Sequence, residues 1–358
     1  MDTLETAIRL MTPCCFMTSI DLKDAYYSVP IAAEYQKYLK FLRRDQLYAF
    51  TCLPMRLTSS PRIFTKILKP VFATLRSKFG HSCLGYIDDS LNLGDTYTEA
   101  EKATLHAVEL LISQGFMIHP EKSIITPTQI IELLGFVLNS ILMIVKRTDR
   151  KAEKITKLCI HFCHKGKAFT IREVASLIGS LISSCPGVGY GRLHYRNIER
   201  DKINALKSQK GNFEAKMSLS HESLEDLAWW IQNVKFQHRN IQHGSPNTVL
   251  FTDASQLEWW AKIQDGRCTN GIWTASEAAM HINILKLLAV KFSLMSLLAD
   301  QTNTHIRIMS DNTTVVCYIN NMGGSKSTEC DRLSKAIWYW TIDRNIWLSA
   351  AHVPGAQN

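Results

Sequence analysis

The sequence of 358 residues lacks several features that mark special classes of protein. No apolar run approaches the roughly 20 residues of a membrane-spanning helix, and no basic segment followed by an apolar one stands at the N-terminus. The ten cysteines lack the even spacing of a disulfide framework, which indicates a reducing compartment. Hydrophobic residues make up 46%, enough for packed cores in two or three domains. We therefore expect a soluble intracellular protein, cytoplasmic or nuclear, that is neither secreted nor bound to a membrane.

One group of cysteines and histidines, Cys159-Ile160-His161-Phe162-Cys163-His164, resembles part of a metal site. Cys159 and Cys163 would share a helix face. A structural zinc site needs four ligands, however, and no second pair of ligands lies nearby in the sequence. Buried free thiols are therefore the favoured interpretation.

Basic residues outnumber acidic ones in the first two thirds of the chain only. The formal net charge is +9, yet residues 248–358 hold nine Lys plus Arg and nine Asp plus Glu, so the whole excess lies in residues 1–247. A basic surface suits the phosphate backbone of a nucleic acid. A generic solubilising charge is the alternative.

Two adjacent carboxylates, Asp88 and Asp89, stand in the middle of an otherwise apolar run that contains Gly85-Tyr86-Ile87. Burying two ionised carboxylates side by side is costly unless a cation compensates them. The flanking segments are short and β-compatible, which predicts a hairpin with the aspartates at its tip. A surface Asp-Asp turn is the alternative.

A third carboxylate, Asp21, ends the apolar strand-like run that begins at Phe16. Three carboxylates from two neighbouring strands are what two divalent ions need to clamp the attacking and leaving oxygens of a phosphoryl displacement. Mg²⁺ prefers oxygen ligands and keeps substrate phosphates and water in its other positions. The pattern predicts a site for Mg²⁺, or Mn²⁺ in its place.

Five ordered segments resemble motifs of reverse transcriptases, and their residues are most similar to those of gypsy-type and DIRS-type retrotransposons. The first three resemble the core polymerase motifs, and the last is similar to the hairpin that grips the primer. The segments are Ser19 to Ile31, Leu53 to Phe64, Tyr86-Ile87-Asp88-Asp89, Gly115 to Ser123, and Leu133-Leu134-Gly135-Phe136-Val137.

This resemblance implies an RNA-directed DNA polymerase that takes an RNA template, a DNA primer and deoxynucleoside triphosphates. It assigns the catalytic metal ions to Asp21, Asp88 and Asp89. Tyr26 matches the aromatic gate that excludes a 2′-hydroxyl, although it could simply be a strand aromatic. Lys122 matches a lysine near the departing pyrophosphate, with a solvated loop charge as the alternative.

The motif after Leu53-Pro54 departs from the family pattern at its substrate-binding positions. Met55 and Arg56 stand where related elements have a polar or aromatic residue followed by Gly. Glycine permits close backbone approach, so the Arg56 side chain would crowd the nucleotide or the template. About 20 residues precede Asp21, too few for the usual finger strands and their triphosphate-binding residues.

Four later segments resemble the successive motifs of a retroelement ribonuclease H: Val249 to Ser255, His281 to Leu285, Ile308 to Asn312, and Ser349 to Gly355. The resemblance implies cleavage of the RNA strand in an RNA-DNA hybrid, with Asp253 and Asp311 as catalytic metal ligands. Lys286 stands where the family has a Glu, and Glu258-Trp259-Trp260 replaces a Gly-Trp-Gly pattern. The family's final Asp would lie beyond Asn358, and His352 is expected to be structural.

We expect an α+β reverse-transcriptase palm with partial fingers and a helical thumb, followed by an α/β ribonuclease H-like domain. The sequence would be truncated at both ends. Palm and partial fingers would occupy residues 1–147, the thumb or connection-like helices 148–236, a linker 237–247, and the C-terminally truncated ribonuclease H-like domain 248–358. The competing hypothesis is a catalytically decayed or domesticated fragment that still binds nucleic acid.

Local patterns predict the main elements. Residues 38–42 and 47–51 read as a hairpin, and the glycine-rich residues 186–191 as a turn. One predicted helix runs from Pro61 to Phe79, with Ser60 as its cap and a kink at Pro70. A second is opened by a Thr98/Glu101 capping box and has Leu105, Val108, Leu111 and Ile112 as its apolar stripe. The other predicted helices are Thr148 to His164, Thr170 to about Pro186, Ser223 to Lys235, and Ser276 to about Leu298.

Overall fold

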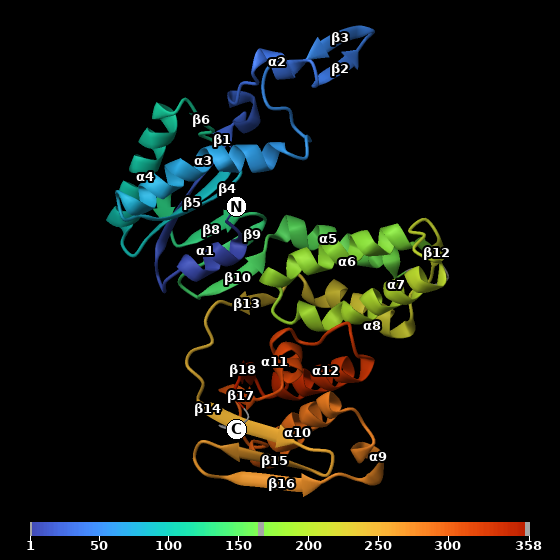
Figure 1. Cartoon of the computed structure of the whole chain (residues 1–358). Coiled ribbons are helices and arrows are strands. Elements are labelled where there is room, and N and C mark those ends of the chain that lie inside the picture. The colour runs from blue at the N-terminus through green and yellow to red at the C-terminus, as the bar shows by residue number, and fades with distance from the viewer. Residues whose placement is uncertain (1, 164–167, 355–358) are drawn as a thin grey trace. The chain divides into compact units, whose positions relative to one another are not determined.

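The computed structural model describes residues 2–163 and 168–354, which divide at Thr148 into two compact units (Figure 1). Each unit has its own buried apolar core. Within the described ranges, no helix is both long enough and apolar enough to cross a membrane.

The first unit is built on a sheet with strand order β4-β5-β1-β6, in which β7 also pairs with β1. All of these pairings are antiparallel. Two helices, α3 (Ser60–Ser77) and α4 (Tyr97–Ser113), pack against this sheet and against each other. The strands are β1 (Phe16–Lys23), β4 (Ser82–Tyr86), β5 (Asp89–Gly94), β6 (Met117–Ile118) and β7 (Ile124–Thr128).

Helix α3 buries one face, and its side chains Phe64, Leu68, Phe72 and Leu75 enter the core at helical spacing. The helix begins one residue earlier than predicted, with Ser59 at the N-cap. The prediction that Ser60 caps it was wrong, because the Ser60 hydroxyl instead donates to the Pro54 carbonyl oxygen at 2.8 Å. That bond ties the start of α3 to the Leu53-Pro54 segment.

Helix α4 is opened by a capping box between Thr96 and Glu99, two residues before the predicted pair. Both Thr-x-x-Glu pairs were available in the sequence, and the structure uses the first. The predicted apolar stripe is confirmed only in part: Leu111 is buried and Val108 packs against the core, whereas Leu105 and Ile112 are more than half exposed. Small residues face the sheet instead, namely Ala100, Ala103, Thr104 and Ala107, and they allow close approach of the helix.

A hairpin and a three-stranded meander complete the first unit, together with the short helices α1 (Leu4–Leu10), η1 (Ala25–Ser28) and α2 (Ala33–Gln36). The predicted hairpin near residues 38–51 is confirmed as β2 (Lys40–Arg43) and β3 (Gln46–Ala49), with every strand residue exposed. The predicted Leu133 to Val137 hairpin is also confirmed: β8 (Ile130–Leu133), β9 (Phe136–Asn139) and β10 (Ile144–Arg147) form an antiparallel meander. Leu134 and Gly135 turn between β8 and β9 with φ of 53° and 77°.

The second unit begins with a group of helices around the buried Trp230, whose indole nitrogen donates to the His194 carbonyl at 2.9 Å. The predicted Thr170/Glu173 capping box is confirmed. Predicted ends shift by a few residues, and His164 lies outside the described residues. The helices are α5 (Asp149–Phe162), α6 (Ile171–Ser184), α7 (Arg196–Ser208) and α8 (His221–Asn233), with the short strands β11 (Phe169–Thr170), β12 (Lys216–Met217) and β13 (His238–Asn240) and the 3-10 turns η2 (Cys185–Gly187) and η3 (Gly191–His194).

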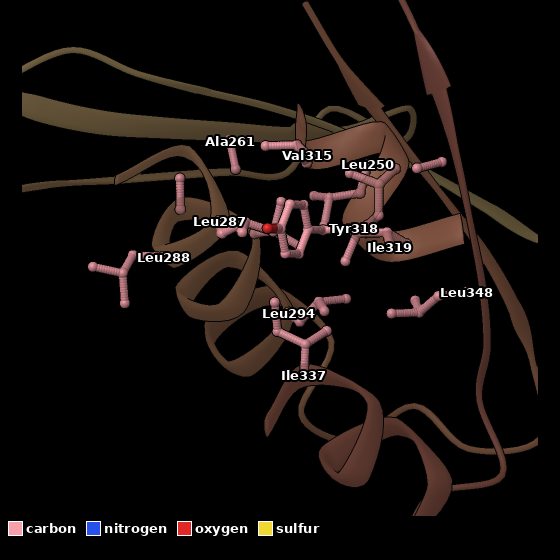
Figure 2. Packing of buried hydrophobic residues seen from close by; sticks show 14 of the residues in the cluster. Leu250, Ala261, Leu287, Leu288, Leu294, Val315, Tyr318, Ile319, Ile337 and Leu348 are labelled. Carbon is pink, nitrogen blue, oxygen red and sulfur yellow. The ribbon is translucent and has the colours of Figure 1, made fainter. Parts of the chain in front are cut away.

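The remainder of the second unit is a five-stranded sheet with order β16-β15-β14-β17-β18. Strand β14 pairs antiparallel with β15 and parallel with β17, and β17 pairs parallel with β18. Helices α10, α11 and α12 supply the core residues that Figure 2 shows against Leu250 and Leu348 of the sheet. The elements are β14 (Thr248–Ala254), β15 (Glu258–Ile263), β16 (Cys268–Ile272), β17 (His305–Ser310), β18 (Trp347–His352), α9 (Ala275–Ala278), α10 (Ile282–Leu297), α11 (Thr313–Asn320) and α12 (Thr328–Ile342).

The single helix predicted from Ser276 to Leu298 was wrong, because the chain breaks it into α9 and α10. His281 has extended backbone angles, and its ring Nδ1 accepts the amide hydrogen of Asn283 at 3.2 Å. A side chain that caps a new helix supplies an acceptor for otherwise unpaired amides. Helix α10 therefore starts at Ile282.

Candidate active site

The paired strands β1 and β5 bring two predicted carboxylates together, because Asp21 lies directly opposite Asp89. Opposite residues of an antiparallel pair project from the same face of a sheet. Asp88 occupies the turn between β4 and β5, next to Ile87 with a φ of 57°. The Leu22 amide donates to the Asp88 carbonyl at 3.0 Å, so the turn is fixed against β1.

Close helix packing positions this turn. A Cβ atom on Gly85 would lie 2.1 Å from the Phe72 ring of α3, which leaves room only for glycine in this arrangement. Strand β4 can therefore approach α3 closely just before Tyr86 and the aspartates. Phe64, on the same helix, makes an edge contact with Tyr26 at a ring separation of 5.5 Å.

The site carries negative charge that the protein only partly compensates. Burial, with the charges of Asp88 and Asp21 added, raises the pKa of Asp89 to about 6 despite the opposing effect of Lys122. Burial also raises the pKa of Asp21, against the lowering effects of Lys122 and His119. A cation bound here would relieve this electrostatic cost.

A pocket of about 280 Å³ lies beside these carboxylates. It brings together the predicted residues Asp21, Tyr26, Met55, Asp88 and Lys122; the other residues that line it are Leu22, Lys23, Asp24, Ala25 and His119. Asp89 is not among the lining residues and lies directly opposite Asp21 in the β1-β5 pair. Arg56 follows Met55 on an exposed turn, with a φ of 67°.

Sequence reasoning missed two residues that hold Asp21. The Asp21 amide donates to the Ser123 hydroxyl at 3.0 Å, and the His119 amide donates to the Asp21 carbonyl at 2.8 Å. The His119 Nδ1 atom is buried and has no protein hydrogen-bond partner. Both residues lie in the Gly115 to Ser123 motif, where only Lys122 was singled out, so motif membership was the one available signal.

A second acidic site lies in the sheet of the second unit. Asp253 is near the end of β14, and Asp311 follows the neighbouring parallel strand β17. The Lys286 ammonium of α10 forms ion pairs with both, at 2.8 Å to Asp253 Oδ1 and more closely to Asp311 Oδ1. Burial lowers the pKa of Lys286, but hydrogen bonds and charges from Asp253 and Asp311 outweigh this, and the pKa is raised.

Across residues 2–163 and 168–354, no three or more His, Cys, Asp or Glu side chains converge into a ready-made metal cage. Cys159, His161 and Cys163 lie within these ranges, and His164 lies outside the described residues. Cys159 is buried and Cys163 half-buried, and both are free thiols.

Comparison with known proteins shows which proteins the first unit resembles. Residues 2–138 match the family model described as reverse transcriptase (RNA-dependent DNA polymerase). The chain is 31% identical over 138 residues to the Gag-Pro-Pol polyprotein of Human T-cell leukemia virus 2, which is 36% of this chain and 9% of that protein. It is 28% identical over 113 residues to the Pol polyprotein of Equine infectious anemia virus (isolate 1369), 29% of this chain and 10% of that protein.

Residues 2–138 are therefore similar to the reverse transcriptase domain of retroviral Pol polyproteins. The chain spans about a tenth of the length of the polyproteins it matches.

Solved structures extend the likeness of fold to nearly the whole chain. The foamy viral protease-reverse transcriptase in complex with an RNA/DNA hybrid matches with a TM-score of 0.53 and 17% identity, over 96% of this chain and 45% of that one. A second structure of that protein, the dRH form in complex with double-stranded DNA, matches with a TM-score of 0.52 and 17% identity, over 97% and 59%. The chain has a reverse-transcriptase-like fold of mixed helix and sheet.

Proposed function

We propose that this chain is the RNA-directed DNA polymerase portion of a Pol-type polyprotein, which extends a DNA primer on an RNA template with deoxynucleoside triphosphates. The observation that carries the proposal is that Asp21 and Asp88 line one pocket, with Asp89 directly opposite Asp21, in residues that match the reverse transcriptase family model. The comparisons do not favour the alternative of a decayed or domesticated nucleic-acid-binding fragment.

The residues at this site fit Mg²⁺ or Mn²⁺. Asp21, Asp88 and Asp89 would hold the ions, since burial and neighbouring carboxylates raise the pKa values of Asp21 and Asp89, and a bound cation would offset this cost of ionisation. An incomplete protein cage suits Mg²⁺, which is commonly bound through one or two carboxylates plus substrate phosphates. When bound, such ions neutralise the charge that develops on the transferred phosphoryl group.

The chain's own residues would position the substrate around these carboxylates. Tyr26 lines the pocket beside Asp21 and would lie beneath the sugar, where its ring leaves no room for a 2′-hydroxyl. Lys122 lines the same pocket and would place its ammonium near the departing pyrophosphate. Ser123 and His119 would keep the Asp21 backbone fixed through their hydrogen bonds.

The residues of the motifs support a more specific origin, a retrotransposon of gypsy or DIRS type. On this proposal the first unit would be a palm with partial fingers at the β2-β3 hairpin, and helices α5 to α8 would be the thumb or connection. The sheet from β14 to β18 would be ribonuclease H-like, because Asp253 lies on β14 and Asp311 directly follows the neighbouring parallel strand β17.

Primer extension tests the polymerase proposal. The chain is incubated with a labelled DNA primer on an RNA template, all four deoxynucleoside triphosphates, and Mg²⁺ or Mn²⁺. We expect extension by the wild-type chain and a loss of at least about 100-fold in Asp88→Asn, because that change weakens metal binding without altering side-chain size.

The matched control is Asp95→Asn, just after the far end of β5, where the carboxylate accepts a hydrogen bond from Thr12 that an amide oxygen can also accept. It should extend normally. Extension by Asp88→Asn at the wild-type rate would remove Asp88 from the mechanism.

A further inference from the structure

The cation at the acidic site of the second unit is a side chain of the protein, the ammonium group of Lys286. Lys286 reaches from α10 to Asp253 and Asp311 at once, and its side chain is only 12% exposed. The two carboxylates it bridges are 46% and 28% exposed. The ammonium is thus the most enclosed member of the cluster and lies between its two partners.

A second contact holds the same helix face to the same turn. The Asn312 side-chain amide donates to the Asn283 side-chain oxygen at 2.8 Å. Asn283 precedes Lys286 by three residues, so both project from one face of α10. Asn312 follows Asp311 and caps α11 through the Val315 amide. Helix α10 is therefore tied twice to the turn between β17 and α11.

A large aromatic side chain also borders this site on the sheet. Trp260 of β15 lies directly opposite Asp253 of β14, so the two side chains project from the same face of the sheet. The Trp260 side chain is 37% exposed, whereas its neighbour Trp259 is buried in the core. An indole beside Asp253 narrows the approach of a bulky ligand to this carboxylate.

We infer that the Lys286 ammonium takes the place of a divalent cation between Asp253 and Asp311, which makes this acidic pair an internal ion cluster that joins α10 to the sheet. The ribonuclease H-type metal site implied by the family motifs does not fit the residues present. A divalent ion at the same oxygens would have to displace the lysine, and an ammonium at that distance repels it. This inference is independent of the proposed polymerase site.

Iron-directed cleavage of the polypeptide tests the inference in the full-length chain. Fe²⁺ replaces Mg²⁺ at carboxylate sites, and with ascorbate and peroxide it generates radicals that cut the nearby backbone. The wild-type chain should give no cuts near residues 253 and 311. Lys286→Glu should give cuts at both positions, because it removes the internal cation and adds a third carboxylate.

The matched control is Lys291→Glu, which makes the same change of charge further along α10 and should behave as wild type. Cuts near residues 21 and 88 report on the polymerase site separately, so their absence would bear on that proposal alone. Wild-type cuts near residues 253 and 311 would overturn the inference. The absence of such cuts in a folded Lys286→Glu chain would overturn it as well.

Thermal unfolding provides a second measurement if Lys286→Glu does not fold. Lys286→Gln leaves the two carboxylates without their cation, so its melting temperature should fall, and Mn²⁺ should partly restore it. The comparison uses chains that also carry Asp88→Asn and Asp89→Asn, so that metal binding at the first site does not contribute. A melting temperature that Lys286→Gln leaves unchanged would show that the ion cluster does not hold α10.

Discussion

Asp21 and Asp89 face each other across the antiparallel pair β1-β5, and the Asp21 charge adds to the cost that burial sets on ionising Asp89. The pKa of Asp89 is raised to about 6, above that of an unfolded aspartate. The native state therefore binds more protons than the unfolded state between these two pKa values. The stabilisation that protonated Asp89 contributes is fully present below pH 4 and is lost as the pH rises through about 6.

We predict that, with chelator present, Asp89→Asn raises the melting temperature relative to wild type at pH 7 but not at pH 4. The amide removes the cost of ionisation that appears only at the higher pH. Calorimetry of both chains across this range checks the prediction. Asp95→Asn should leave the pH dependence unchanged, and an equal gain for Asp89→Asn at both pH values would contradict it.

The basic charge excess of residues 1–247 predicts where nucleic acid contacts the chain. Lys40 and Arg43 are exposed on the β2-β3 hairpin, next to the partly exposed rings of Phe41 and Tyr48. Aromatic and basic side chains together suit a nucleic acid strand. Changing both Lys40 and Arg43 to Gln should weaken primer-template binding and reduce the slope of log K against log salt by up to about 0.9 per lost contact.

Fluorescence anisotropy at several salt concentrations measures this slope. The control changes two exposed basic residues of the second unit, Lys262 and Arg307, to Gln. It removes the same charge and should leave the slope nearly unchanged. Equal effects of the two double variants would show that the uneven charge distribution does not direct binding.

Local sequence signals predicted the first site better than the second. The hairpin that carries Asp88 and Asp89 could be predicted because its pattern depends on adjacent residues. The first residue of α4 could not be predicted, because Thr96 and Thr98 each begin a possible capping box and the sequence does not distinguish them. The break before α10 depends on a histidine cap, which periodicity does not reveal.

The contacts of the second site are harder still to predict from the sequence. The motif comparison placed Lys286 at the position of a family Glu, which indicated an altered charge. That the ammonium reaches Asp253 and Asp311 together depends on the packing of α10 against β14. His119 was missed for a related reason, since its contact with Asp21 is made through the backbone.

The ion cluster at Lys286 predicts that this chain leaves the RNA strand of an RNA-DNA hybrid intact. Hydrolysis at such a site needs metal-bound water, and the lysine occupies the carboxylate oxygens that would hold the metal. A hybrid with labelled RNA, incubated with Mg²⁺ or Mn²⁺ and resolved on a gel, checks this. Cleavage by the wild-type chain that Asp253→Asn abolishes would contradict the prediction.

Arg56 provides a test of the turn beside the polymerase pocket. Its φ of 67° lies in the left-handed region, which costs a residue with a Cβ atom about 1 kcal/mol relative to glycine. The family pattern has glycine at this position. Arg56→Gly should therefore raise the free energy of unfolding by up to about 1 kcal/mol, and denaturant titration measures the gain.

Nucleotide affinity separates relief of backbone strain from relief of crowding. Met55, the preceding residue, lines the pocket, so a smaller side chain at position 56 should also strengthen deoxynucleoside triphosphate binding if Arg56 crowds the substrate. The matched control is Arg44→Gly in the β2-β3 turn, where φ is 50°. That variant should gain similar stability without a change in nucleotide affinity. Affinity that is unchanged or lower in Arg56→Gly would show that the arginine does not crowd the pocket, and that the departure from glycine at this position affects folding alone.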